Sequence, residues 1–82
     1  MVDAKDVRAL RLARTEFHKH GVNVERADIR VLHGILYIRG YVEPQRGSMI
    51  HDMKHDMETL ARVLRQKSDI REVVLDCTYP KV

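Results

Sequence analysis

The two histidines of His51-Asp-Met-Lys-His55 form the arrangement in this chain that could most readily support chemistry. Two histidines four positions apart lie on one face of a helix and can share a metal ion, and Glu58 on that face could supply a third ligand. The pattern is similar to the His-Glu-x-x-His of zinc proteases, but Asp52 replaces the glutamate and is a shorter base. We prefer a plainer interpretation, a solvated helix face, and expect no catalytic residue, no bound metal and no cofactor.

Three smaller groups of residues also have plainer explanations. The cluster His18-Lys19-His20 precedes a glycine, and cations are favoured at the C-terminal end of a helix. Cys77 is expected on the inward face of a strand, where a free cysteine acts as a small apolar residue. Met49, Met53 and Met57 are expected to face the core or a second copy of the chain. We therefore do not expect an enzyme.

The chain has 82 residues, of which 44% are hydrophobic and 33% are charged. This composition predicts one small globular domain, residues 1–82, with a modest core and little room for a substrate cavity. The single cysteine excludes a disulfide framework within the chain. The net charge is +3, and the excess lies in the N-terminal half. Dedicated nucleic-acid-binding proteins usually show a denser basic stripe.

The N-terminal residues lack the basic and then apolar pattern of a secretory signal. No apolar run approaches the roughly 18 residues that a membrane span needs. We expect a soluble chain, cytoplasmic as written, or periplasmic if it was trimmed from an exported parent.

Apolar periodicity predicts two helices. The first covers residues 6–20, with Asp3 or Asp6 as its cap. Its apolar stripe is expected to be Val7, Leu10, Ala13 and Phe17. The second begins at Gly47 or Ser48 and runs to about Lys67, roughly 30 Å. Its stripe is expected to be Ile50, Met53, Met57, Leu60, Ala61 and Leu64.

A hairpin is predicted at residues 29–42, because two apolar strands flank His33-Gly34. Two-residue loops that end in glycine favour a turn with positive φ at both positions, and this turn determines the register. Gly34 and Gly40 are therefore expected to be structural. The predicted partners are Leu32–Ile35, Val31–Leu36, Arg30–Tyr37, Ile29–Ile38, Asp28–Arg39, Ala27–Gly40 and Arg26–Tyr41.

This register separates the hairpin into a core face and an outer face. The core face holds Ile29, Val31, Leu36, Ile38 and Val42 with the small pair Ala27 and Gly40. The outer face is a candidate contact surface, because protein interfaces are enriched in tyrosine and arginine. The alternative is simple cross-strand pairing, with arginines stacked on tyrosines and Asp28 paired to Arg39. Its candidate binding residues are Arg26, Arg30, Leu32, Ile35, Tyr37, Arg39 and Tyr41.

The last element is predicted to be a strand over residues 70–79, after a loop at 43–47 and the second helix. Val73, Leu75, Cys77 and Tyr79 are expected to point inward. The order helix, strand, strand, helix, strand predicts an α+β two-layer sandwich, with both helices on one face of a mixed three-stranded sheet.

The segment from Ala27 to Val42 resembles the hairpin of the BON domain (bacterial OsmY and nodulation domain). Gly40 and Val42 match the Gly-x-Val that ends the family's apolar strand, and the resemblance covers about residues 5–79. Family members usually have a shorter second helix and a glycine near Ser68. The resemblance implies a bacterial module that binds phospholipid or partner proteins without catalysis.

We therefore expect a binding or assembly module that contacts a partner protein or an anionic phospholipid surface. The hairpin's outer face and the basic first helix, with Arg8, Arg11 and Lys19, would make the contact. We also expect the chain to associate with further copies of itself as a homo-oligomer. One alternative is a KH-like nucleic-acid-binding module, although Gln45-Arg-Gly-Ser48 lacks its Gly-x-x-Gly clamp. A more remote alternative is a metal-dependent enzyme that uses His51 and His55.

Overall fold

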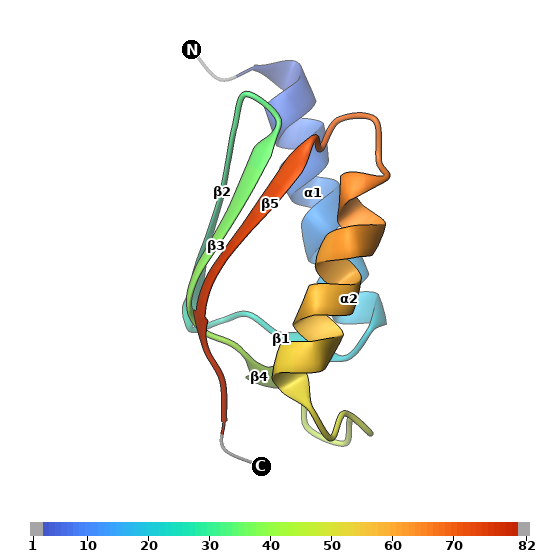
Figure 1. Ribbon diagram of the computed structural model, residues 1–82, viewed down its shortest axis with the longest axis vertical. Helices are drawn as coiled ribbons and strands as arrows, with labels where there is room; N and C mark the ends of the chain where they lie inside the picture. Colours follow the sequence, from blue (N-terminus) through green and yellow to red (C-terminus); the bar gives the residue numbers. More distant parts are fainter. Residues whose placement is uncertain (1–2, 81–82) are drawn as a thin grey trace.

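The computed structural model describes residues 3–80, so residues 1–2 and 81–82 of the predicted domain lie outside the described part. Figure 1 shows the arrangement of its helices and strands. In chain order the elements are α1 (Ala4–Lys19), β1 (Val22–Asn23), β2 (Ala27–Leu32), β3 (Ile35–Tyr41), β4 (Glu43–Pro44), α2 (Met53–Arg65) and β5 (Glu72–Thr78).

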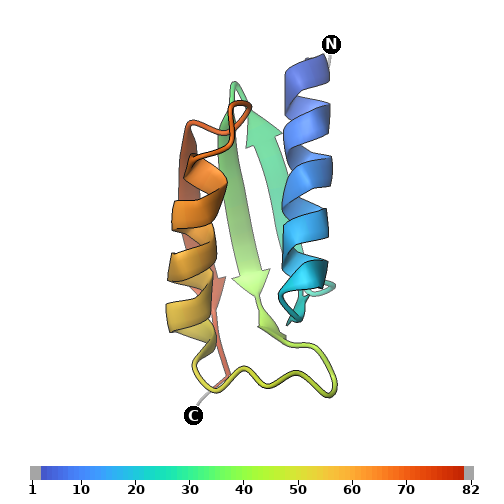
Figure 2. The same ribbon diagram turned by 90° about the vertical axis from the view of Figure 1, so that its right-hand side faces the viewer.

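The main sheet has the strand order β2-β3-β5. β2 is antiparallel to β3, and β5 is parallel to β3. Both helices pack on the same side of this sheet, and the other side carries no helix (Figures 1 and 2). The predicted α+β fold, with two helices on one face of a mixed three-stranded sheet, is confirmed. No helix of residues 3–80 is both long enough and apolar enough to cross a bilayer.

The hairpin follows the register predicted from its turn. His33 and Gly34 have φ angles of 53° and 80°, so both adopt the left-handed conformation that a tight two-residue hairpin requires. The strands pair from Ala27 opposite Gly40 to Leu32 opposite Ile35. Gly40 has a φ of 113°, and a Cβ there would lie 2.9 Å from the carbonyl oxygen of Arg26. The backbone of β3 at Gly40 therefore approaches the neighbouring backbone at Arg26 so closely that only glycine fits at position 40.

The residues that α1 buries differ from the predicted apolar stripe. Its buried residues are Ala9, Ala13 and Phe17, spaced four apart, and the two alanines let α1 approach the sheet closely. Val7 was predicted to be in the core, but 40% of it is exposed. Asp3 is the N-cap, and its side chain accepts a hydrogen bond from the N–H of Lys5 at 2.9 Å.

The second helix is shorter than predicted, because it begins at Met53 instead of residue 47 or 48. Asp52 is its N-cap and accepts a hydrogen bond from the N–H of His55 at 3.1 Å. Ile50 therefore lies before the helix, although it still packs against the core. Met49 is 83% exposed and lies before the helix, whereas Met53 and Met57 are buried.

A second, two-stranded sheet was not predicted. β1 and β4 pair antiparallel, with Val22 opposite Pro44, where a loop was expected at residues 43–47. The last strand is β5, with Ile35 opposite Glu72 and Tyr41 opposite Thr78. Val73 is buried, and Leu75, Cys77 and Tyr79 are partly buried against the core, so the predicted inward face of this strand is confirmed.

Candidate contact surface on the open side of the sheet

The side of the sheet away from the helices is formed by alternate residues of three strands, and we call it the open sheet face. Neighbouring rows follow from the register, which places Arg30, Tyr37 and Val74 side by side and Asp28, Arg39 and Asp76 in the next row. The open sheet face consists of Asp28, Arg30, Leu32, Ile35, Tyr37, Arg39, Tyr41, Val74, Asp76 and Thr78, with Glu72 at its edge, where it pairs with Arg65 of α2.

Apolar side chains are exposed in two rows of this face, the row of Leu32 and the row of Tyr37. Leu32 is 57% exposed, Tyr37 38% and Val74 40%. Ile35, next to Leu32 in the register, is half-buried. Val74 is not among the contact residues predicted from the sequence, because its place beside Tyr37 depends on the parallel pairing of β3 with β5. Exposed apolar residues that gather in one place are typical of a contact surface.

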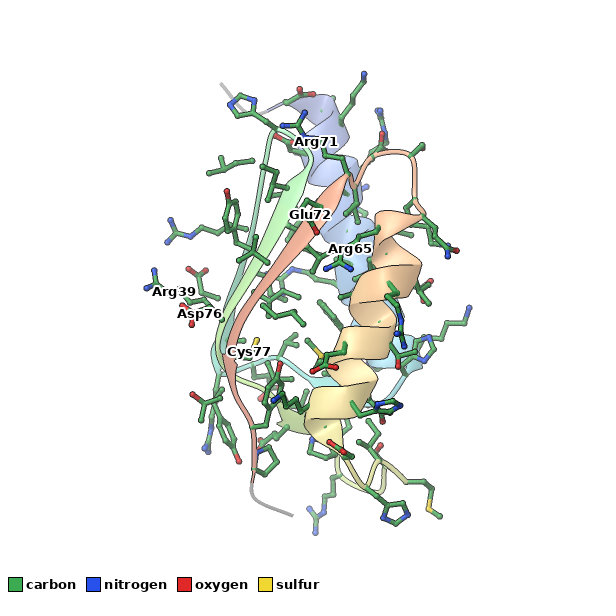
Figure 3. The ribbon with its side chains drawn as sticks, viewed as in Figure 1. Arg39, Arg65, Arg71, Glu72, Asp76 and Cys77 are labelled. Carbon is green, nitrogen blue, oxygen red and sulfur yellow. The ribbon has the colours of Figure 1, made fainter. Side chains whose placement is uncertain are left out.

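The arginines of the open sheet face are paired with carboxylates. The Nε atom of Arg30 lies 2.8 Å from Oδ2 of Asp28 on the same strand. The Nε atom of Arg39 lies 3.4 Å from Oδ2 of Asp76, and both side chains point away from the helices (Figure 3). Asp28 lies opposite Arg39 in the register, as predicted. The predicted ion pair between them is wrong, because each side chain has a different ion partner. The positive charge of both arginines is balanced locally.

A shallow hollow of about 250 Å³ lies on the β2–β3 part of the face. It is lined by Asp28, Arg30, Leu32, Tyr37 and Arg39. The hollow is thus bordered by an aromatic ring, an aliphatic side chain and two guanidinium groups, which can receive a side chain of a partner. Arg26 and Tyr41 lie below it, where the N–H of Tyr41 donates to the carbonyl of Arg26 at 3.4 Å.

The basic first helix does not belong to this surface. α1 lies on the opposite side of the sheet (Figure 1). Arg8 forms an ion pair with Asp69 at 3.4 Å, and Arg11 and Lys19 are exposed. His20 forms an ion pair with Glu16 at 3.4 Å. The hairpin's outer face and α1, which were both expected to contact a partner, therefore do not form one continuous surface.

The histidine pair of the predicted metal candidate does not lie on one helix. His51 precedes the N-cap of α2, whereas His55 and Glu58 lie within the helix. The four-residue spacing therefore does not bring the two imidazoles to one helical face. Among residues 3–80, no group of three or more His, Cys, Asp or Glu side chains could hold a metal ion.

Cys77 points toward the helices and is half-buried (Figure 3). Its Sγ atom donates to the carbonyl oxygen of Ile38 at 3.4 Å. Burial raises the pKa of this thiol, which favours the unreactive protonated form.

The loop of Gln45 to Ser48 leads from β4 toward α2. The backbone N–H of Gln45 donates a hydrogen bond to the carbonyl oxygen of Gly21 at 2.8 Å.

Comparison of the chain with protein-family models, curated proteins and solved structures found no match.

Proposed function

We propose that the chain is a non-catalytic binding or assembly module of the BON-domain kind, which contacts a partner protein through the open sheet face. The observation that carries this proposal is the position of Leu32, Tyr37 and Val74. All three are exposed, and no helix covers them. Tyr37 and Val74 are paired on β3 and β5, and Leu32 on β2 lies one row away from Tyr37. An apolar centre with a polar rim is the usual composition of a protein interface.

The charges of the open sheet face favour a protein over an anionic lipid surface as the partner. Lipid headgroups attract clusters of unpaired basic residues. Here Arg30 and Arg39 each have a carboxylate neighbour, and the exposed Arg11 and Lys19 lie on the other side of the sheet. A protein partner can instead match both signs of charge along the face.

The proposal can be tested by replacing two exposed apolar residues of the face. The double variant Leu32→Ser/Tyr37→Ser should lose the partners that the wild-type chain captures from its own cells. Val7→Ser is a matched control, since Val7 has a similar exposure to Tyr37 but lies on α1. Capture that is equal for all three chains, or lost in both variants, contradicts the proposal. Vesicles of anionic lipid at low salt test the lipid alternative directly.

A further inference from the structure

The open sheet face has a pattern of charge that is complementary to itself when two copies meet face to face. Along β2, Asp28 and Arg30 are consecutive outward residues, and along β3, Arg39 and Tyr37 are consecutive outward residues. The midpoint between the two rows lies level with Ile29, which pairs with Ile38. A two-fold axis at this level, running across the strands, would place each row opposite the other.

In this orientation the central contacts of β2 and β3 are favourable, whereas Asp76 of β5 lies opposite Val74 of the other copy. Asp28 of each copy would lie opposite Arg30 of the other, which forms two ion pairs. Arg39 of each copy would lie over Tyr37 of the other, where a guanidinium interacts well with an aromatic ring. That guanidinium would enter the hollow lined by Tyr37 and Leu32. Antiparallel sheets that pack face to face in this way keep their strands within about 30° of each other.

A two-fold axis that runs along β3 is unfavourable. It would keep each row at its own level. It would place Arg39 opposite Arg39 of the second copy and Asp28 opposite Asp76. Like charges directly opposite each other destabilise a contact. The charges therefore disfavour an axis along β3. The experiment below also distinguishes the proposed arrangement from one with the axis along the strands between β2 and β3, which would place Asp28 opposite Arg39.

We propose that the open sheet face binds a second copy of this chain, face to face, with Asp28 opposite Arg30. This inference rests on the proposed function, because it names the partner of the same surface. The existing Asp28–Arg30 ion pair is solvent-exposed, so exchanging it for an intermolecular pair costs little.

The size of the face makes the complex weak. Three strands about 4.8 Å apart and six or seven residues long cover at most roughly 14 by 23 Å. This footprint of about 320 Å² is well below the ~800 Å² per partner of a standard stable interface. The dimer should therefore form only at high concentration and weaken as salt screens its ion pairs.

The experiment is sedimentation velocity from about 10 μM to about 1 mM, the range in which a weak dimer forms. The variants Asp28→Arg and Arg30→Asp each turn two attractions into two repulsions and should weaken self-association about tenfold or more. An equimolar mixture should recover a heterodimer, because the arginine introduced at position 28 then lies opposite the aspartate introduced at position 30. Both variants lose the Asp28–Arg30 pair within the chain, so a simple folding defect would not be repaired by mixing.

Three results would overturn the inference: a monomer up to about 1 mM in the wild type, single variants that associate like the wild type, or a mixture that fails to recover. If the wild type stays monomeric while capture still depends on Leu32 and Tyr37, only this inference fails. If capture does not depend on those residues, the proposed function fails.

Discussion

The carboxylate of Asp6 accepts a hydrogen bond from the backbone N–H of Gly34 at 3.0 Å, across 28 positions of the chain. Its other oxygen accepts the N–H of His33 at 3.1 Å. The carbonyl of Gly34 in turn accepts the N–H of Arg71 at 2.9 Å. The tip of the hairpin is thus connected to the first turn of α1 and to the start of β5, which links three separate parts of the chain.

We predict that Asp6→Ala destabilises the fold by about 1–3 kcal/mol, because two N–H groups of the turn lose a charged acceptor. The free energy of unfolding in urea measures this effect. Asp56→Ala is the matched control, since Asp56 lies in the first turn of α2 and its side chain makes no hydrogen bond within residues 3–80. It should cost only the interaction with the helix dipole, about 0.3–1 kcal/mol. Equal losses for the two variants would show that Asp6 does not hold the turn.

A second prediction concerns Gly40, where the chain both adopts a positive φ and approaches its neighbour. Gly40→Ala would place a Cβ 2.9 Å from the carbonyl oxygen of Arg26, so the hairpin must open or shift. We expect a loss of about 2–4 kcal/mol from strain and overpacking together. Gly47→Ala is the control, because Gly47 has a φ of 84° but no atom within 4 Å of the added Cβ. It should lose about 1–2 kcal/mol from conformational strain alone, and thermal unfolding distinguishes the two.

The hairpin and its register could be predicted from the sequence because local signals agree there. The pair His33-Gly34 determines the turn, and the alternation of apolar residues is consistent with one register. The ion-pair partner of Arg39 could not be predicted from the hairpin. Asp28 lies opposite Arg39 in the register, but Asp76 on the parallel strand forms the ion pair with Arg39. That choice depends on the crossover through residues 42–71, which joins β3 to β5.

The first residue of α2 could not be predicted from the sequence, for a different reason. Ser48 and Asp52 are both good N-caps, and Ile50 fits the apolar period of a longer helix. The chain before Asp52 is instead held by other contacts. The pairing of β1 with β4 directs it, and Ser48 donates from its backbone N–H to the carbonyl of Gln45 at 2.9 Å. Strands of two residues are too short to produce a period in the sequence, so neither strand could be predicted.

The third prediction is a loss of stability in acid that depends on Glu72. Its Oε1 atom accepts the N–H of Val73 at 2.8 Å and Nε of Arg65 at 2.7 Å, where α2 meets β5 (Figure 3). The hydrogen bond from Val73, followed by Arg65, lowers the pKa of this carboxyl below its ordinary value of 4.5. The unfolded chain therefore binds the proton first as the pH falls. This contribution to stability is complete above the ordinary value and is lost below it.

Glu72→Gln should therefore make the free energy of unfolding less dependent on pH below about 4.5. Arg65→Gln should remove a smaller part of the dependence, because the hydrogen bond from Val73 remains. Urea unfolding of the three chains at several acidic pH values provides the comparison. A Glu72→Gln profile parallel to that of the wild type would contradict the assignment.

The fourth prediction is a loss of stability in alkali that depends on Cys77 and Tyr79. Burial raises the pKa of Cys77 above its ordinary value of 9.0, and burial followed by the charge of Cys77 raises the pKa of Tyr79. Above the ordinary values the unfolded chain has released protons that the folded chain still holds, so rising pH favours unfolding. Cys77→Ala and Tyr79→Phe should each make the free energy of unfolding fall less steeply as the pH rises, whatever their effect at neutral pH.

The folded thiol of Cys77 should also react with a disulfide reagent more slowly than the same thiol in the chain unfolded by urea, because its thiolate is scarce. Equal rates in the two states would show that the sheet does not protect Cys77.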